Sequence, residues 1–483
     1  MHFIKEVART SLIVILIVIW SCKDQSSTNT VQTDLEQVDS TEQLTIFFVN
    51  DQHGQLQNFA KVKHIVDRAR DSLNVLLVCA GDMFSGSPFV DQHTEKGFPM
   101  IDVMNKVGFD VSVIGNHEFD YGQEVLSKRM VEAEFQWVCA NVDVKETDLP
   151  QPNSYVTLEA GDLKVTFLGL VETNGKPGAV IPATHPWRVS GLEFQRFQNV
   201  VNNYENLKSS ENSDVLIALT HLGSYSDRVL ATDYPYFDLI IGGHSHEVIN
   251  ESVNDIPIVQ SGSYLNYLGK IELEIEGQNV ISSKINFINL DGYNSKDNDL
   301  AELINSYEHS AQFDEIVGYS TTWMGKNEVG CFYTTALMEY LETDCSFQNG
   351  GGIRSSIDQG DITALEIYNM DPFNNSSVIF TMTVADIRRF FEETGAGEHV
   401  SGLDLVQEQD RLVVYDLSGN QLDDSETITI GINDYIPAVY DEYFPLEKAD
   451  IKDFTTAEAI ISYLETIQDT VDYEGCNRYF DFQ

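Results

Sequence analysis

Short apolar runs, each followed by a polar cluster, recur along the first part of the chain, from Leu44 to about Ser263. Uninterrupted apolar runs of this length are typical of strands that are buried on both faces. Between them lie stretches that predict helices, such as Ala60–Arg70 and Met100–Val107. This alternation predicts a layered α/β fold, in which chemistry is placed at the carboxyl ends of the strands. The strand-like runs are Leu44–Val49, Val75–Ala80, Val111–Ile114, Val215–Leu219 and Leu239–Ile241.

The pattern changes at about Asp291. Residues 291–315 are polar, with a helical pattern near Leu300–Gln312, and we interpret them as a linker helix. After them, residues 316–483 mix predicted strands and helices. Because 483 residues exceed what one hydrophobic core usually serves, we expect two domains, 44–290 and 316–483.

The first 22 residues have the features of an export signal. Basic residues precede an apolar run, Leu12–Trp20, which is shorter than a membrane-spanning helix needs. The run ends at Ser21-Cys22, which resembles a bacterial lipoprotein processing site and implies a lipid on Cys22. Residues 23–43 are polar and predict a flexible tether. We expect a lipid-anchored protein of the cell envelope; a plain signal peptide or an uncleaved anchor are the alternatives.

The formal net charge of −47 limits the possible partners. Nucleic-acid binding calls for a basic footprint, so we exclude a nucleic-acid partner. The same charge repels phosphate compounds at long range, so a phosphate site must be locally positive. Bound metal ions and a few arginines could supply that charge. Nothing in the sequence predicts a protein partner.

The cysteines do not predict a thiolate metal site. No C-x-x-C spacing is present. Cys79 and Cys139 lie inside apolar runs and are interpreted as small core residues. Cys331 and Cys345 are near enough in sequence to form a disulfide in an oxidising compartment, but the spacing does not establish that pairing.

Five of the eleven histidines fall directly after strand-like runs, together with aspartate and asparagine. A single histidine in such a place is usually structural or solvated. Convergence from five separate segments instead predicts a metal centre with mixed nitrogen and oxygen ligands. Two cations roughly 3.5–4 Å apart can clamp a phosphate and activate water. The candidates are Asp51, His53, Asp82, Asn116, His117, His221, His244 and His246.

These residues lie in motifs that resemble the calcineurin-like metallophosphoesterases and, more narrowly, the 5′-nucleotidases. The motifs follow the order of that family, and the resemblance covers most of the chain after Gln43. It implies an α/β class in which a four-layer α/β/β/α sandwich precedes a smaller mixed α/β substrate-binding domain. The motifs are D-Q-H-G (51–54), G-D (81–82), G-N-H-E-F-D (115–120), T-H-L-G (220–223) and G-H-S-H (243–246).

The resemblance also implies a role for each residue. His117 would stabilise charge on the transferring phosphoryl group, and Asp120 would orient its imidazole. Water activated by the metals would be the nucleophile. The metals would be two divalent ions of zinc, manganese, iron or cobalt, and the donor set leaves their identity open. Asp51, His53 and His246 would hold one ion, and Asn116, His221 and His244 the other, with Asp82 bridging the two.

The remaining residues near these motifs receive no chemical role from the sequence. Phe119 is interpreted as a core residue, and Glu118 is given no function. Five other histidines have no ligand-like context, and we interpret them as structural or solvated. They are His64, His93, His185, His309 and His399.

The second domain contains motifs that resemble the substrate-recognition region of 5′-nucleotidases. N-G-G-G-I-R (349–354) would place Arg354 on the substrate phosphate and Asn349 near the nucleoside. D-P-F-N (371–374) and N-D-Y (433–435) imply that Phe373 and Tyr435 enclose the base. Asp441 would bind the ribose hydroxyls. The alternatives are a tight turn, core aromatics and a surface ion pair for Arg354.

Two departures from the family pattern concern specificity. The segment Trp323–Phe332 lacks an arginine that the family uses on phosphate, and Lys326 could replace it as a less directional charge. The glycine-rich turn that the family has before Asp441 is replaced by Pro437–Tyr440, which could reshape the sugar pocket. The metal site is therefore better defined by the sequence than the substrate is.

The sequence predicts an extracytoplasmic phosphohydrolase that releases phosphate from nucleoside 5′-monophosphates or related nucleotides. One alternative keeps the site and changes the substrate, as in a 2′,3′-cyclic-nucleotide phosphodiesterase or another ester hydrolase of the same fold. The other alternative is a surface lipoprotein that binds nucleotide without turnover. An intact pair of His117 and Asp120 disfavours this last interpretation, because binding alone does not need it.

Overall fold

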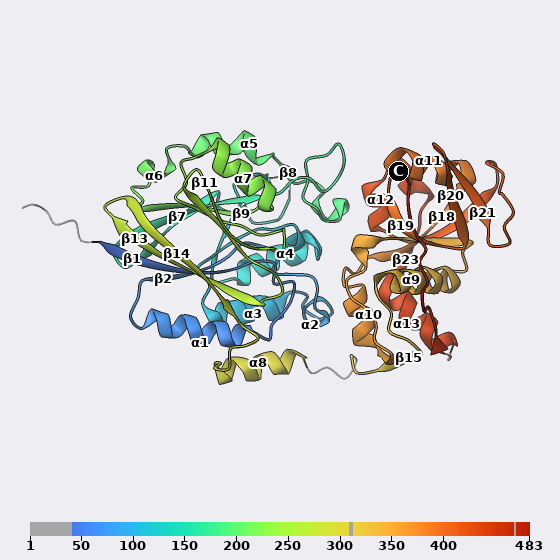
Figure 1. Ribbon diagram of the computed structural model, residues 1–483, viewed down its shortest axis with the longest axis horizontal. Coiled ribbons are helices and arrows are strands. Elements are labelled where there is room, and N and C mark those ends of the chain that lie inside the picture. Colours follow the sequence, from blue (N-terminus) through green and yellow to red (C-terminus); the bar gives the residue numbers. More distant parts are fainter. Residues whose placement is uncertain (1–40, 146, 309–312, 468–469) are drawn as a thin grey trace, which may run out of the picture. The chain divides into compact units, whose positions relative to one another are not determined.

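The computed structural model describes residues 41–145, 147–308, 313–467 and 470–483 (Figure 1). The predicted signal peptide, the lipidation site at Cys22 and nearly all of the predicted tether lie outside these residues. The first strand, β1, begins at Glu42, so the last two residues of the predicted tether belong to the sheet. Within the described residues, no helix is both long enough and apolar enough to cross a bilayer.

The first part of the chain forms two six-stranded sheets. Strands β1, β2, β3 and β4 pair in parallel in one sheet, and β7, β9, β10 and β12 pair in parallel in the other. Antiparallel strands lie at one edge of the first sheet and at both edges of the second. The first has the order β14 (Asn279–Asn289), β13 (Tyr267–Glu276), β1 (Glu42–Val49), β2 (Val75–Cys79), β3 (Val111–Val113), β4 (Gln136–Val138). The second has the order β11 (Val248–Val253), β12 (Ile256–Ser261), β10 (Leu239–Ile241), β9 (Val215–His221), β7 (Leu163–Val171), β6 (Tyr155–Ala160). A short ribbon pairs β5 (Val142–Asp143) with β8 (Glu193–Phe194).

Three apolar cores separate the layers of this part. The side chains of Phe48 and Phe167 lie in the core between the two sheets. Each sheet is covered by helices on its outer side (Figure 1). The helices beside the first sheet are α1 (Phe59–Arg70), α2 (Pro88–Asp91), α3 (Phe98–Val107) and α4 (Gly122–Glu132). Those beside the second sheet are α5 (Phe197–Val200), α6 (Leu207–Ser210) and α7 (Ser224–Asp233). Phe119 is fully buried in the first helical layer, as expected. The order helix, sheet, sheet, helix confirms the predicted sandwich.

Helix α8 (Asn298–Glu308) lies within the predicted linker. Its apolar residues Leu300 and Ile304 belong to the same core as α1 and α3, so this helix packs on the first part of the chain. The predicted helix was placed at Leu300–Gln312; the observed one begins two residues earlier, and residues 309–312 are not described.

The second part of the chain is a smaller mixed α/β domain. Its main sheet has the order β23 (Asp450–Thr455), β18 (Ser376–Thr383), β22 (Thr427–Asn433), β16 (Cys345–Asn349), β19 (Gly397–Ser401), β25 (Tyr479–Asp481). A three-stranded sheet contains β17 (Gly360–Thr363), β15 (Ile316–Ser320) and β24 (Thr470–Val471), and β20 (Leu403–Glu408) forms a hairpin with β21 (Arg411–Asp416). The helices are α9 (Lys326–Leu341), α10 (Ala364–Met370), α11 (Val384–Thr394), α12 (Tyr435–Val439) and α13 (Thr456–Ile467).

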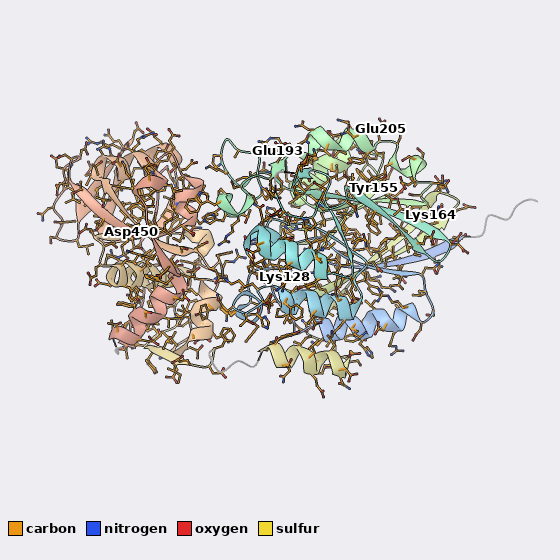
Figure 2. All side chains as sticks on the ribbon, turned by 180° about the vertical axis from the view of Figure 1, so that it is seen from behind. Lys128, Tyr155, Lys164, Glu193, Glu205 and Asp450 are labelled. Carbon is orange, nitrogen blue, oxygen red and sulfur yellow. A yellow bond between two sulfur atoms is a disulfide. The ribbon has the colours of Figure 1, made fainter. Side chains whose placement is uncertain are left out.

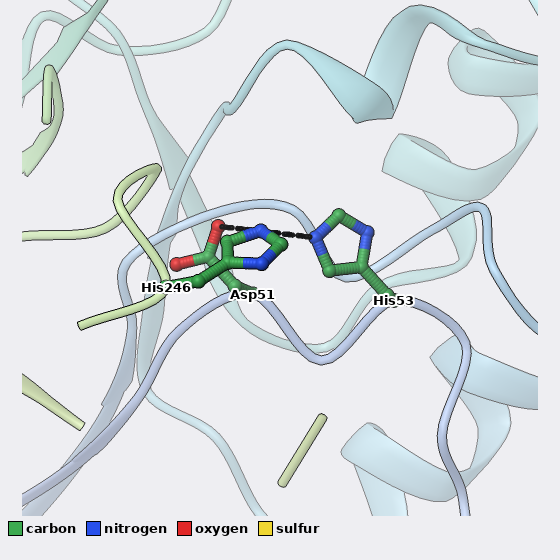
Figure 3. Close-up of side chains that lie close together, drawn as sticks. All are labelled: Asp51, His53 and His246. Atoms are coloured by element: carbon green, nitrogen blue, oxygen red, sulfur yellow. Dashed lines mark hydrogen bonds and ion pairs between the residues drawn. The ribbon is translucent and has the colours of Figure 1, made fainter. Parts of the chain in front are cut away.

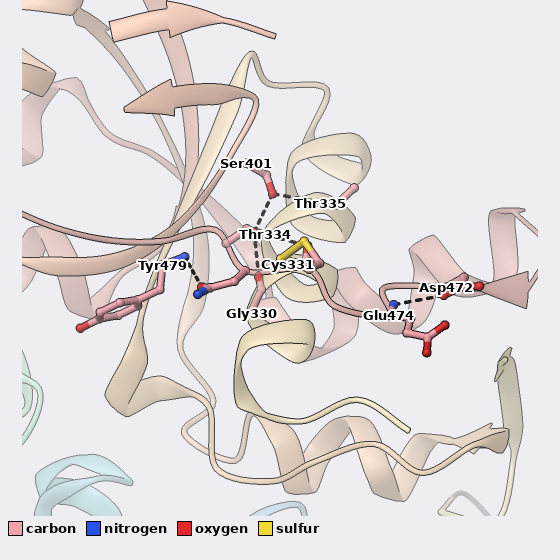
Figure 4. Close-up of a disulfide and its surroundings, with 10 residues drawn as sticks. Gly330, Cys331, Thr334, Thr335, Ser401, Asp472, Glu474 and Tyr479 are labelled. Atoms are coloured by element: carbon pink, nitrogen blue, oxygen red, sulfur yellow. Dashed lines mark hydrogen bonds between the residues drawn. A yellow bond between two sulfur atoms is a disulfide. The ribbon is translucent and has the colours of Figure 1, made fainter. Parts of the chain in front are cut away.

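A disulfide joins Cys331 on α9 to Cys476, 145 residues further along the chain (Figure 4). The sequence left open whether Cys331 pairs with Cys345; the two do not pair, and Cys345 is a free, buried residue of β16. Proximity in sequence favoured Cys345, whereas the fold returns the C-terminal segment to α9. Cys79 and Cys139 are free and buried, as predicted.

Charged side chains cover the outside of the molecule. The exposed residues Lys128, Glu193, Glu205 and Asp450 extend from its surface in Figure 2. Because acidic residues outnumber basic ones by 76 to 29, this surface is acidic outside the cavities described below. The long-range field therefore opposes the approach of anions.

Candidate metal centre and active site

The predicted ligands lie at or just after the carboxyl ends of strands from both sheets. Asp51 and His53 follow β1, and Asp82 follows β2. Asn116 follows β3, His221 ends β9, and His244 and His246 follow β10. Since the parallel strands of both sheets end at the same edge of the sandwich, these seven side chains meet there.

The seven residues form two adjoining clusters. Asp51, His53 and His246 place one ligand atom each within 4.8 Å of one another (Figure 3). In this cluster, Nε2 of His53 lies 2.9 Å from Nε2 of His246. Asp82, His221 and His244 make a second group of the same kind.

Two short contacts define the second cluster. Nε2 of His221 is 2.9 Å from Oδ2 of Asp82, and Nδ1 of His244 is 2.9 Å from Oδ1 of Asn116. Asp82 also belongs to a third group, with His53 and His117. Its carboxylate therefore lies between the two clusters, where a bridging ligand is needed.

The backbone at these positions is strained. Five of the seven residues have a positive φ, a conformation that non-glycine residues rarely adopt. Such strain costs of order 1–3 kcal/mol per residue and gathers at functional sites. The five are Asp51 (52°), His53 (49°), Asp82 (56°), His244 (79°) and His246 (57°).

The donor set fits two divalent cations. Nδ1 of His221 lies 2.7 Å from the carbonyl of Ala80, and Nδ1 of His53 lies 3.0 Å from the carbonyl of Ser85. An Nδ1–H donated to a carbonyl leaves Nε2 without a proton and free to bind metal, which is the usual arrangement of a metal-binding histidine. Nε2 of His221 is buried and lies 2.9 Å from Oδ2 of Asp82.

Burial and neighbouring charges set the protonation of the cluster. Burial lowers the pKa of His53 well below its usual value, and lowers those of His244 and His246 to about 4. These imidazoles are therefore neutral at physiological pH, as metal binding requires. Burial alone would raise the pKa of Asp82, but His221 and His117 outweigh it and hold that pKa well below its usual value.

Glu118 holds the segment that carries Asp82. Its buried carboxylate accepts hydrogen bonds from the backbone N–H groups of Asp82 (3.0 Å), Met83 (2.7 Å) and Gly115. Sequence reasoning gave Glu118 no function because it neither follows a strand nor matches a ligand. The structure gives it a positioning role, since it ties the loop after β2 to the loop after β3.

His117 and Asp120 form the expected pair. Nδ1 of His117 lies 2.6 Å from Oδ2 of Asp120, and the hydroxyl of Thr184 donates to the other carboxylate oxygen at 2.8 Å. Burial alone would lower the pKa of His117, but Asp120 and Asp82 outweigh it and raise that pKa to about 9. The fixed Nδ1 leaves Nε2 of His117 available to a substrate.

A cavity of about 290 Å³ joins these residues to the second domain. The Phe373 ring lies 6.0 Å from the His117 ring and is nearly parallel to it, at 20°. The guanidinium of Arg354 lies 5.5 Å from the centre of the Phe373 ring. The cavity is lined by Asp82, Asn116, His117, Asp120, His244 and His246 together with Asn349, Arg354, Phe373 and Tyr435.

Three further polar lining residues come from the segment after β7, which sequence reasoning missed. His185, interpreted from the sequence as structural or solvated, is almost fully buried, and its Nε2 is 3.4 Å from Oδ1 of Asp434. Arg188 donates to the carbonyl of Phe373 at 3.1 Å. Thr184, described above, is the third. No periodic pattern or strand end marks this loop, so the only available signal was an isolated arginine beside a tryptophan.

Other expected contacts are not assembled here. Asp441 is not among the residues that line the cavity; its exposed carboxylate pairs with Lys176 at 2.9 Å. Lys326 lines a neighbouring cavity instead of this one. His64 and His93 contact aromatic rings outside the site, His399 is buried beside Tyr479, and His309 lies outside the described residues.

The chain matches two family models in succession. Residues 44–248 match the calcineurin-like phosphoesterase model, and residues 310–446 match the 5′-nucleotidase C-terminal domain. Protein UshA of Yersinia enterocolitica is 26% identical over 515 residues, which cover 88% of this chain and 92% of that protein. Endonuclease YhcR of Bacillus subtilis is 24% identical over 456 residues, which cover 85% of this chain but only 37% of that longer relative.

A solved structure supports the same assignment of the fold. The 5′-nucleotidase precursor from Thermus thermophilus superposes with a TM-score of 0.76 at 21% identity, covering 89% of this chain and 97% of that one. The chain therefore combines a calcineurin-like phosphoesterase domain with clustered side chains that could hold metal ions. Its two domains, in this order, place the chain in the 5′-nucleotidase family of calcineurin-like phosphoesterases.

Proposed function

We propose that this chain hydrolyses nucleoside 5′-monophosphates or related nucleotides at a dinuclear metal centre. The observation that carries the proposal is the convergence of seven donors, in which Asp82 lies in one group with His221 and His244 and within reach of His53 of the other cluster. Asp51, His53 and His246 would hold one cation. Asn116, His221 and His244 would hold the other. When bound, two such cations neutralise phosphate charge and lower the pKa of water.

The residues beside the metal centre would act on the phosphoryl group. His117 is fixed by Asp120 and presents Nε2 to the cavity, where it would donate to a phosphoryl oxygen. Its raised pKa of about 9 keeps the imidazole protonated at neutral pH and suits that role. Thr184 and Arg188 hold Asp120 in place from the other side, at 2.8 and 4.0 Å.

The second domain would bind the rest of the nucleotide. Arg354 would contact the phosphate, since its guanidinium lines the same cavity as His117. Phe373 and Tyr435 would flank the base, and Asn349 would contact the nucleoside. Asp441 would reach the ribose hydroxyls only after leaving Lys176, which makes it the least supported of these contacts.

We further propose that the protein works in the cell envelope, anchored by a lipid on Cys22. The motif at Ser21-Cys22 and the polar segment after it support this location. A disulfide between Cys331 and Cys476 suits an oxidising compartment outside the cytoplasm. Labelling of the expressed full-length chain with a fatty-acid analogue, compared with Cys22→Ala, tests the anchor.

Phosphate release from AMP tests the activity. The chain lacking its first 22 residues, loaded with Mn²⁺ or Zn²⁺, is expected to hydrolyse AMP and to lose that activity with a chelator. Binding of AMP without product would instead make the chain a non-catalytic nucleotide-binding lipoprotein. Failure to release phosphate from any nucleotide, cyclic nucleotide or sugar phosphate would end the proposal.

One observation favours a second substrate class, 2′,3′-cyclic nucleotides. Lys326 stands where the family has a phosphate-binding arginine, and it does not line the first cavity. The basic residues that line the cavity, among those described, are Arg188 and Arg354 together with the histidines. A cyclic diester carries less charge than a monoester and needs fewer cations. Higher kcat/KM for 2′,3′-cyclic AMP than for AMP would favour this class.

A further inference from the structure

A second cavity, of about 620 Å³, adjoins the first. The two share Asn349, Gly351 and Tyr435, so Tyr435 forms a wall between them. Ligand pockets typically measure roughly 300–1,000 Å³, which puts the first cavity at the small end of the range. A nucleotide whose phosphate lies at the metal centre therefore has room to extend past Tyr435 into the second cavity.

Glu398 lines this second cavity and has an unusual environment. Its side chain is 2% exposed, and its Oε2 has no hydrogen-bond partner among the described residues. Burial alone raises its pKa to about 8. A buried polar atom without a partner costs free energy and is rare in folded proteins. The fold therefore keeps a carboxyl group here without giving it an internal partner.

The strand register places Glu398 beside the substrate-binding residues. On adjacent antiparallel strands, Glu398 of β19 lies directly opposite Asn349 of β16. Residues paired in this way lie on the same face of the sheet, with Cβ atoms about 4.5–5.5 Å apart. Tyr435 and Tyr440 line the same cavity as Glu398, whose carboxyl contributes to the raised pKa of both phenols.

The side chain of His399, the next residue on β19, lies on the other side of the sheet. Side chains alternate along a strand. The ring of His399 packs against Gly330 of α9 so closely that a Cβ atom on Gly330 would lie 2.1 Å from Nδ1 of His399. Glu398 and His399 both line the second cavity, and Glu398 is the one that shares a face of the sheet with Asn349.

A protonated carboxyl group offers one donor and one acceptor next to each other. The edge of a nucleobase has the complementary pair, as in the ring nitrogen and amino group of adenine. The cavity walls suit such a flat ring, because aromatic side chains and glycine backbone, Tyr435, Tyr440, Gly350, Gly351 and Gly397, line it. An aliphatic leaving group would use neither the flat walls nor the paired donor and acceptor.

We propose that Glu398 is a specificity-determining residue, which binds the polar edge of a nucleobase that Phe373 and Tyr435 flank and whose far edge extends into the second cavity. This inference rests on the proposed nucleotide hydrolysis and names the feature of the substrate that the second domain recognises. Glu398 touches neither the phosphate nor the metal clusters, so it acts on the choice of leaving group.

Two substrates and three variants test the proposal. AMP and ribose 5-phosphate share the phosphate and the ribose, and only AMP has a base. In Glu398→Leu, the ratio of kcat/KM for AMP to that for ribose 5-phosphate is expected to fall about 10–100-fold. In Glu398→Gln, which keeps a donor and an acceptor, the ratio is expected to stay within about 3-fold. Glu465→Leu, the same change at an exposed site on α13, is expected to leave the ratio unaltered.

Binding of adenosine separates this inference from the proposed activity. Adenosine has no phosphate, so its dissociation constant can be measured by calorimetry whether or not the protein hydrolyses anything. Weaker binding in Glu398→Leu, with recovery in Glu398→Gln, would support the inference even if no substrate is turned over. An unaltered ratio and unaltered adenosine binding in Glu398→Leu would overturn it, as would the absence of adenosine binding by the native chain.

Discussion

The two halves of the molecule build their parts of the site in different ways. In the first half, ligands come from strand ends in two sheets, and five of them occupy strained backbone positions. In the second half, Arg354 and Phe373 come from loops and Tyr435 from the short helix α12. The first arrangement fixes side chains rigidly for chemistry. The second leaves recognition to connecting segments, which vary more readily without disturbing the core.

The largest effect is expected from changing the catalytic imidazole of the first half. His117→Asn removes the donor to the phosphoryl group, so kcat for AMP is expected to fall about 10²–10³-fold. Metal content is expected to stay the same, because His117 is not one of the seven ligands. Steady-state kinetics measures the effect, with His64→Asn on α1 as the control. A kcat within about 3-fold of the native value would remove His117 from the chemistry.

The stability of the second half should depend on its disulfide, between Cys331 and Cys476. Replacing both Cys331 and Cys476 by alanine is expected to lower the free energy of unfolding of this half by about 2–4 kcal/mol, since the link closes a long loop. Calorimetry with and without reductant measures it: reductant should shift the transition of the native chain and not that of the variant. Equal shifts in both would contradict the account.

Arg354 should affect binding more than turnover. Its charge-assisted contact with phosphate is worth about 1.5–3 kcal/mol, so Arg354→Ala is expected to raise KM for AMP about 10–100-fold. Arg411→Ala, at an exposed position on β21, is the matched control. If Arg354→Ala lowered kcat without raising KM, the assignment of chemistry to the first half and of substrate binding to the second would be wrong.

The last effect concerns pH, and it is the smallest when counted over a single pH unit. The folded pKa of Glu398 is about 8, above its ordinary value of 4.5. The folded state thus binds the proton more tightly, and this contribution to stability is complete below pH 4.5 and is lost as pH rises to about 8. Glu398→Gln cannot ionise, so its stability relative to the native chain should increase with pH in this window, by about 1 kcal/mol per pH unit. Thermal unfolding at several pH values measures it; a constant difference would show that Glu398 titrates normally.

The extent of sequence-based prediction also differs between the halves. The metal-site residues could be predicted because apolar runs end in Asp, Asn or His, and parallel strands bring their carboxyl ends to one edge. Thr184, His185 and Arg188 were missed because their loop has no periodic signal, and only the packed structure brings it against Asp120 and Phe373.

Long-range contacts explain the other misses. Cys476 is separated from Cys331 by most of the second domain, so sequence proximity favoured the wrong partner, Cys345. Glu398 attracted no attention because a single glutamate in a strand carries no motif. Its importance comes from the register with Asn349 and the lack of a partner among the described residues, and neither is visible in the sequence.

The central claim is that seven side chains hold two metal ions through a shared carboxylate. Elemental analysis of the purified, metal-loaded chain tests it most directly, with Asp82→Asn beside the exposed control Asp162→Asn. We predict two divalent ions per native chain and per Asp162→Asn chain, and a clear loss of metal in Asp82→Asn with the fold retained. A native chain that binds no more metal than Asp82→Asn would contradict the account.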